Sequence, residues 1–198
     1  RIYKGSHSAR QDRVILHLYD LSAGDEKNAE NLAIREFDAL HRMQLYPWAP
    51  RILDSYQEVP GFSGEMYFFT VVDPAAPSVK ERAADKSWDV PMRLSFSLNA
   101  VRALGELHDS DPESGQVLHR NISSKTLLVK HDNSPIFTSF GLAKLPSELS
   151  ISTATAPPDG WDPAVAPEVR EKGLPAADQR SDTYSLCAAI SILFGEPD

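Results

Sequence analysis

The hydrophobic pattern of this chain changes from strand-like to helix-like at residues 74–91, a segment rich in proline and alanine. Before it, side chains such as Val14, Leu16 and Leu18 alternate with their neighbours, and this two-residue period is typical of β-strands. After it, the apolar residues recur every three or four positions, as in helices. The sequence therefore predicts an α+β protein in which a small sheet precedes a mainly helical part.

Four strands and a single helix are expected before residue 74. The strands are expected at residues 1–5, 12–21, 51–59 and 65–73, and the helix at residues 26–43. Residues 74–91 are interpreted as a linker. Beyond it we expect a long helix, a short hairpin, a polar loop and a strongly apolar helix, at residues 92–109, 126–140, 145–163 and 181–194. In the long helix, the apolar stripe is expected to be Leu94, Leu98, Val101, Leu104 and Leu107.

Composition narrows the function classes. The net charge of −8 argues against a basic nucleic-acid-binding surface over the whole domain. The single cysteine, Cys187, excludes a disulfide within the chain and favours a reducing, cytoplasmic setting, and we expect its side chain to be buried. No stretch approaches the ~20 apolar residues of a membrane span, so no membrane association is expected.

Five short motifs occur in a fixed order along the chain. They are VILHLY at 14–19, HRNISSKTLLV at 119–129, SFGLAKL at 139–145, VAPEV at 165–169 and SDTYSL at 181–186. In this order they resemble the protein kinase motifs V-A-I-K, H-R-D-L-x-x-x-N, D-F-G, A-P-E and the start of the buried helix of the large lobe.

The resemblance implies a protein kinase-like fold. Residues 1–73 would form the small lobe without its first strand and glycine-rich loop, residues 74–91 the hinge, and residues 92–198 the large lobe, incomplete after its central buried helix. The chain would thus be truncated at both ends and be part of a larger protein. The strand and loop patterns also resemble, more narrowly, kinase-like domains of bacterial phage-defence proteins of the PglW type, which would imply a role in antiviral defence.

The resemblance places different residues at the positions that carry kinase chemistry. Asn121 stands where a carboxylate would accept the proton of the substrate hydroxyl, and an amide is not a base. Thr126 and Ser139 stand at the two metal-ligand positions, where neutral hydroxyls supply no charge to a hard cation such as Mg²⁺. His17 stands at the position of the lysine that holds the phosphates, with Glu36 as its expected helix partner.

The residues that match the family are those with architectural explanations. His119 is expected to pack in the core, Arg120 to hold the loop, and Asp182 to hold the backbone of that loop. The full set of matching positions is His119, Arg120, Phe140, Gly141, Ala166, Pro167, Glu168 and Asp182.

The chemical positions are replaced while the architectural positions are kept. This contrast predicts a pseudokinase, a kinase-like domain without phosphotransferase activity that acts as a scaffold or allosteric regulatory module. Two alternatives stay open: a nucleotide-binding sensor, and an enzyme with repurposed, metal-poor nucleotide chemistry. Any nucleotide pocket would use His17, Glu36, Thr126 and Ser139. No cofactor and no metal are expected. The expected partners are another protein, such as an active kinase, other domains of the same chain, or a second copy, because the apolar helix at 181–194 should be covered.

Overall fold

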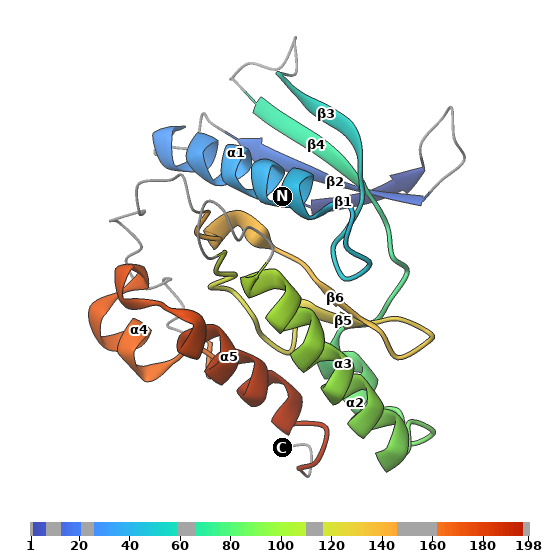
Figure 1. The fold of residues 1–198 in the computed structure, drawn as a ribbon. Coiled ribbons are helices and arrows are strands. Elements are labelled where there is room, and N and C mark those ends of the chain that lie inside the picture. The colour runs from blue at the N-terminus through green and yellow to red at the C-terminus, as the bar shows by residue number, and fades with distance from the viewer. Residues whose placement is uncertain are drawn as a thin grey trace. The chain divides into compact units, whose positions relative to one another are not determined.

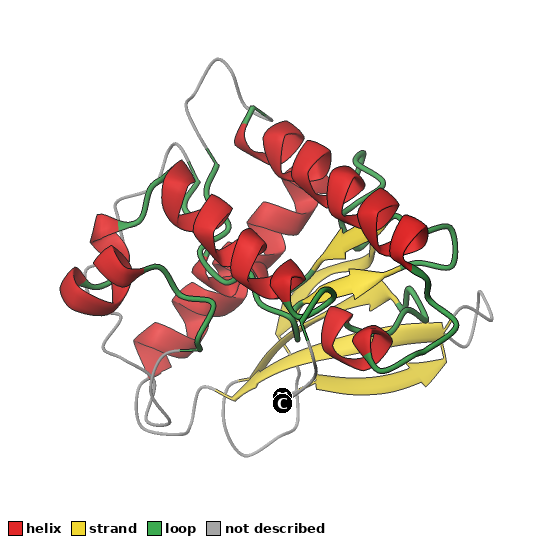
Figure 2. Cartoon of the chain, turned by 90° about the horizontal axis from the view of Figure 1, so that it is seen from below, coloured by secondary structure: helices red, strands yellow, loops and turns green. Residues whose placement is uncertain are grey.

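The computed structural model describes residues 2–6, 13–20, 26–58, 66–109, 117–145 and 162–195. They belong to two compact units. Unit 1 is Arg1–Ala75 with Phe140–Leu142, and unit 2 is Ala76–Ser139 with Ala143–Asp198. Strands and helices are both present (Figures 1 and 2), and the prediction of an α+β protein with an antiparallel sheet is confirmed. Most of the polar loop expected at 145–163 lies outside the described residues.

Unit 1 contains an antiparallel four-stranded sheet in the order β1-β2-β4-β3 (Figure 1). The strands are β1 (Ile2–Ser6), β2 (Arg13–Asp20), β3 (Ile52–Glu58) and β4 (Met66–Val72). Strand β2 has a neighbour on each side, and His17 lies opposite Ile2 on β1 and Phe69 on β4. The His17 position is therefore in the interior of the sheet, where the backbone is held by hydrogen bonds from both neighbours.

Helix α1 (Glu26–Met43) has the bounds that the sequence predicts. Its buried stripe follows the helical repeat, at Ala33, Glu36, Leu40 and Met43. Glu36 is only 4% exposed because it belongs to this stripe rather than to the solvated side of the helix. A buried carboxylate needs hydrogen-bond or charged partners, since burial alone disfavours its ionised form. Its partners identify the site in unit 1.

Unit 2 is mainly helical (Figure 2). Its two long helices, α3 (Val90–His108) and α5 (Gln179–Ser191), pack against each other and run antiparallel. Arg93 near the start of α3 donates to the carbonyl of Leu193 just beyond α5, and His108 at the end of α3 bonds Asp182 in the first turn of α5. The other elements are β5 (Leu127–Val129), β6 (Pro135–Phe137), α4 (Pro167–Lys172) and a short 3₁₀ turn, η2 (Leu174–Ala176).

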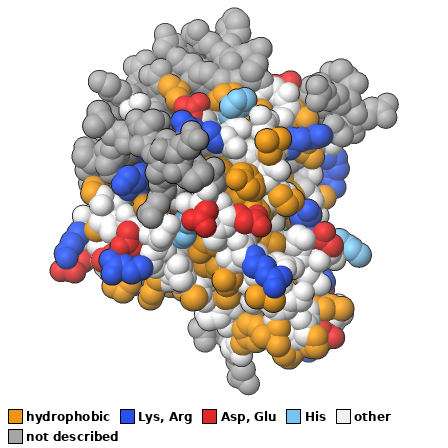
Figure 3. Space-filling model, in the orientation of Figure 1, with side chains coloured by type: hydrophobic (Ala, Val, Ile, Leu, Met, Phe, Trp, Pro, Cys, Tyr) orange, Lys and Arg blue, Asp and Glu red, His pale blue; other side chains and the backbone are white. Residues whose placement is uncertain are grey.

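The apolar stripe expected on α3 is corrected by the structure. Leu94, Leu98 and Val101 are 51–56% exposed, whereas Leu104 and Leu107 are buried as expected. The buried face is completed by smaller or aromatic residues at the same helical spacing, namely Phe96, Ala100 and Ala103. Helix α3 thus carries apolar residues on two faces, and a 3.6-residue period fits both of them equally. Figure 3 shows hydrophobic side chains gathered over the lower end of α3 as it is drawn in Figure 1.

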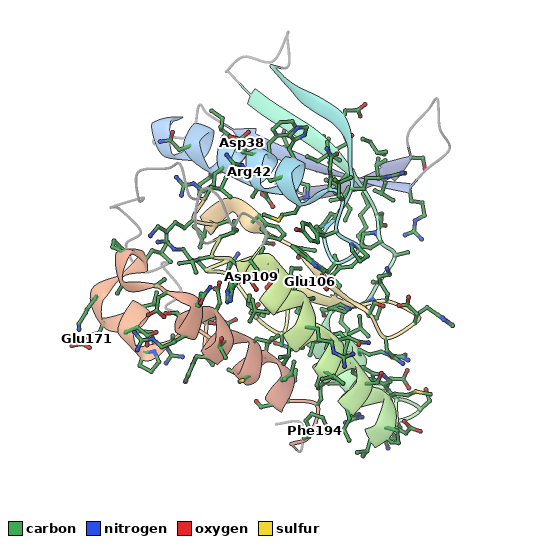
Figure 4. The ribbon with its side chains drawn as sticks, in the orientation of Figure 1. Asp38, Arg42, Glu106, Asp109, Glu171 and Phe194 are labelled. Atoms are coloured by element: carbon green, nitrogen blue, oxygen red, sulfur yellow. The ribbon has the colours of Figure 1, made fainter. Side chains whose placement is uncertain are left out.

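Helix α5 also differs from its expected burial. Leu186 and Ala189 face the core, but Cys187, which was expected to be buried, is exposed. Beyond the helix, Phe194 is 50% exposed and lies at the end of the described chain (Figure 4). The helix is therefore apolar on its outer side too, and the expectation that a partner covers it stays a prediction. In the described part of the chain, no helix has the length and apolar character needed to cross a membrane.

Of the segment expected as a linker, residues 74–91, the part from Ala76 onward belongs to unit 2 and is structured. It contains α2 (Val79–Ala83), which begins with a reciprocal capping box between Ser78 and Glu81. After α2, the side chain of Trp88 is 1% exposed, and its ring packs edge-on against Phe96 with the ring centres 5.6 Å apart. These contacts fix the segment to α3, so proline and alanine content alone did not make it a free linker.

Candidate functional site

The site in unit 1 begins with His17 and Glu36, which the structure brings together. Nδ1 of His17 lies 3.6 Å from Oε2 of Glu36, and both residues are buried, with 8% and 4% exposure. The sheet interior places His17, and the buried stripe of α1 places Glu36. At 3.6 Å the two atoms are further apart than in an ordinary N–H···O hydrogen bond of 2.7–3.2 Å, so the contact is mainly electrostatic.

Two further groups bind the same carboxylate. Tyr19 was not singled out from the sequence, and Phe140 was expected only as a motif residue. The hydroxyl of Tyr19 donates to Oε2 of Glu36. The backbone N–H of Phe140, in the 3₁₀ turn η1 (Phe140–Leu142), bonds the carboxylate as well. The contact of Tyr19 with Glu36 could have been anticipated from the sequence. Residues two apart on a strand point to the same face, and Tyr19 follows His17 by two. The Phe140 contact joins residues about a hundred positions apart and leaves no local signal.

These contacts set the charge state of the cluster. Burial by itself raises the pKa of Glu36, but the neighbouring His17, together with the hydroxyl of Tyr19 and the Phe140 amide, outweighs it and lowers the pKa below its ordinary value. Burial, followed by the charge on Glu36 and the hydrogen bond to it, strongly raises the pKa of Tyr19. At neutral pH Glu36 is therefore an anion and Tyr19 a neutral donor.

This charge state predicts how acid affects stability. A carboxyl group whose pKa is lowered on folding stabilises the protein above its unfolded pKa, about 4.3 for glutamate, and loses that contribution as the pH falls through the folded value. We expect wild type to lose unfolding free energy more steeply than Glu36→Gln below about pH 4.3. Urea unfolding at a series of pH values measures both slopes, with the exposed Glu171→Gln as the matched control (Figure 4). Parallel profiles for wild type and Glu36→Gln would contradict the prediction.

In unit 2, the backbone of the HRN motif is held by one buried carboxylate. Asp182 is 1% exposed and accepts from the backbone N–H groups of His119 at 2.7 Å and Arg120 at 2.8 Å. Nε2 of His108 lies 3.1 Å from the same carboxylate, a partner that the sequence analysis missed. Arg120 has a φ of 64°, a left-handed conformation that costs roughly 1–2 kcal/mol for a residue other than glycine. Asp182 therefore bonds the backbone of a strained loop.

The side chains of Asn121 and Thr126, at the expected base position and one expected metal position, bond to nearby backbone groups. Nδ2 of Asn121 donates to the carbonyl of Ser139 at 3.2 Å. Oγ1 of Thr126 donates to the carbonyl of Asn121 at 2.7 Å and accepts from the backbone N–H of Ser123 at 2.9 Å. Ser139 is half-buried with a φ of 66°. The structure thus joins Asn121, Thr126 and Ser139 in one network without a charged oxygen.

Unit 1 therefore holds His17 and Glu36, while unit 2 holds Asn121, Thr126 and Ser139. Within the described ranges, no cluster of three or more His, Cys, Asp or Glu residues could hold a metal ion.

The remaining motif residues have structural environments. Ala166 is buried and precedes α4, whose first turn contains Pro167 and Glu168. Oε1 of Glu168 accepts from the hydroxyl of Ser181 at 2.5 Å, which ties α4 to the start of α5. In unit 1, Phe140 is completely buried, and a side chain added at Gly141 would lie 3.8 Å from Glu36.

Comparison with known proteins supports the kinase-like class. No family model matches the chain. Over 131 residues it is 30% identical to the rabbit (Oryctolagus cuniculus) anti-Muellerian hormone type-2 receptor, covering 56% of this chain and 23% of the receptor. It is 31% identical over 122 residues to a probably inactive leucine-rich repeat receptor-like protein kinase of Arabidopsis thaliana, covering 61% and 18%. A receptor-like serine/threonine-protein kinase of the same plant is 35% identical over 111 residues, covering 54% and 14%.

The chain thus spans less than a quarter of the length of these relatives. It shares weak homology with protein kinases, and a kinase-like domain is supported.

Proposed function

We propose that this chain is a kinase-like domain that lacks phosphotransferase activity and acts as a scaffold or allosteric module. It would act on another protein, such as an active kinase, or on other domains of the same protein. The observation that carries the proposal is the network in unit 2: the residues at the base and metal positions are neutral, and the side chains of Asn121 and Thr126 bond the backbone around them.

The chemical reason is the electrostatic demand of phosphoryl transfer. Catalysis in this class depends on metal ions and charged groups that stabilise the charge developing on the transferred phosphoryl group. Asn121 cannot take up a proton from a hydroxyl, and the hydroxyl of Thr126 already donates to the loop backbone. His17 takes the position of the lysine, and its nearest carboxylate, Glu36, also receives the hydroxyl of Tyr19. The residues expected to act as base, to bind metal and to hold the phosphates are therefore all replaced in this chain.

One relative in the comparison is itself named as probably inactive, which is compatible with this proposal. A cytoplasmic setting, and membership of the phage-defence class of the PglW type with its antiviral role, stay predictions from the sequence. The relatives whose names specify a kinase are receptor kinases of plants.

The proposal predicts no phosphoryl transfer from ATP. The purified chain is incubated with radiolabelled Mg²⁺-ATP and a general protein substrate. We expect no label above background because the base and metal-ligand positions hold the neutral residues Asn121, Thr126 and Ser139. The matched variant is Asn121→Ala. A trace signal from a contaminating kinase would be the same for wild type and variant, whereas transfer that falls with Asn121→Ala would belong to this chain and contradict the proposal.

A thermal-shift titration with ATP, with and without Mg²⁺, tests whether the chain binds nucleotide. A ligand that binds the folded state stabilises it by RT ln(1 + [L]/Kd), so a very weak site gives no shift. We expect millimolar ATP to leave the melting temperature unchanged with or without Mg²⁺. A rise of several degrees without metal would favour the nucleotide sensor. A rise that requires Mg²⁺ would contradict the argument that His17, Thr126 and Ser139 cannot support a metal–phosphate site.

A further inference from the structure

The carboxylate of Glu36 joins three elements of unit 1. Tyr19 and His17 contact it from β2, Glu36 itself comes from α1, and the N–H of Phe140 reaches it from η1. Helix α1 and η1 also pack directly against each other. Glu36 is therefore a polar centre shared by the three elements, and its hydrogen bonds help to hold them together.

We propose that Tyr19 replaces the expected lysine as the main partner of Glu36, forming a clamp that holds β2, α1 and η1 together without a nucleotide. The inference rests on the proposed function in one respect: no lysine or nucleotide phosphate competes for the carboxylate. The clamp is a conformational device, because its loss would release both the helix and the 3₁₀ turn from the sheet.

The geometry favours Tyr19 over His17 in this role. Tyr19 forms a direct hydrogen bond to Oε2, whereas the nearest His17 nitrogen is 3.6 Å from the same atom. A hydrogen bond from a neutral hydroxyl to an ionised carboxylate is among the stronger ones in proteins. The phenol also avoids the cost of placing an ammonium group in a site where Glu36 is only 4% exposed.

Tyr19 is not at position 17, where the lysine is expected, but its place on β2 still lets its side chain reach Glu36. On β2, residues 17 and 19 point to the same face of the sheet, so both approach α1. Tyr19 is opposite Tyr67 on β4, two residue pairs along from His17 and Phe69. Gly141 lies beside the junction, and a Cβ there would be 3.8 Å from Oε2 of Glu36 and 3.9 Å from Leu32, so the turn approaches the helix closely.

Amide hydrogen exchange of the whole chain, without nucleotide, tests the clamp. Tyr19→Phe removes only the hydroxyl, and Tyr3→Phe, on β1 of the same sheet at a 46% exposed position, is the matched control. We expect Tyr19→Phe to speed exchange about tenfold or more in α1 and at Phe140–Leu142, because a hydrogen bond to a charged group contributes at least that factor. Tyr3→Phe should leave these rates unchanged, and α5 should not respond in either variant.

Two outcomes would overturn the clamp. One is exchange in Tyr19→Phe that matches wild type, and the other is faster exchange confined to β2 while α1 and η1 keep their wild-type rates. If Tyr19→Phe does not fold, Glu36→Gln keeps an acceptor but removes the charge, and α1 and η1 should again exchange faster together.

A lysine at position 17 provides the complementary test. In a His17→Lys background the new ammonium would compete for Glu36, so adding Tyr19→Phe should raise exchange by a smaller factor than it does in wild type. An equal factor in both backgrounds would contradict a shared role. The exchange measurements use no ATP, so detection of phosphoryl transfer would overturn the proposed function and leave the clamp standing.

Discussion

Replacement of Asp182 with alanine is expected to lower the free energy of unfolding by about 3–5 kcal/mol. The change leaves two buried backbone N–H groups, of His119 and Arg120, and the ring of His108 without their common acceptor. Unsatisfied buried donors lose the full cost of desolvation, and the left-handed backbone of Arg120 loses the bond that holds it. Chemical denaturation of wild type and variant measures the difference.

The first control for Asp182→Ala is Asp178→Ala, at the N-cap of the same helix. Asp178 accepts from the backbone of Arg180 and Ser181 but has a 44% exposed side chain, so its loss should cost about 1 kcal/mol. Asp182→Asn, which keeps one acceptor oxygen, should fall between the two. A cost for Asp182→Ala no larger than that for Asp178→Ala would show that the loop does not depend on the buried carboxylate.

Trp88→Ala is expected to cost about 3–5 kcal/mol, the range for removing a large aromatic side chain from a core. The indole is 1% exposed, packs against Phe96, and lies beneath the guanidinium groups of Arg82 and Arg93, 5.4 and 5.9 Å from the ring centre. Its Nε1 donates to Oδ1 of Asn133 at 2.9 Å. The size of this cost decides between an anchored segment and the linker expected from composition. The melting temperature should fall by roughly 2–4 °C for each kcal/mol lost.

Two smaller changes separate the contributions of Trp88. Trp88→Phe keeps an aromatic ring and loses the N–H, so it should cost much less than Trp88→Ala. Asn133→Ala removes the acceptor of that N–H and tests the hydrogen bond alone. If Trp88→Ala cost less than about 1 kcal/mol, the segment would behave as a surface linker and the packing described for it would be wrong.

Much of the secondary structure could be predicted because its signals are local. Helix α1 has the predicted bounds, and each expected strand is present within one or two residues at its ends. The errors concern burial. Leu94, Leu98 and Val101 are exposed because periodicity shows which residues share a face but not which face meets the core. The expected burial of Cys187 was also wrong, because residue type gives only an average preference for burial.

The sequence by itself determined which chemical groups stand at each motif position, because residue identity does not depend on folding. That Asn121, Thr126 and Ser139 bring no charge, and that position 17 is not a lysine, follows directly from the printed residues. Their motif order was enough to indicate a kinase-like domain, which weak homology to protein kinases supports.

Only the tertiary structure decided what those groups bind. The contact of Glu36 with Phe140 and the bond of His108 with Asp182 join residues 104 and 74 positions apart. The anchoring of Trp88 by Asn133 and the use of Tyr19 beside His17 also depend on how strands and helices meet. Local propensity carries no information about such partners, because the free energy of these contacts arises only when distant segments pack and exclude water.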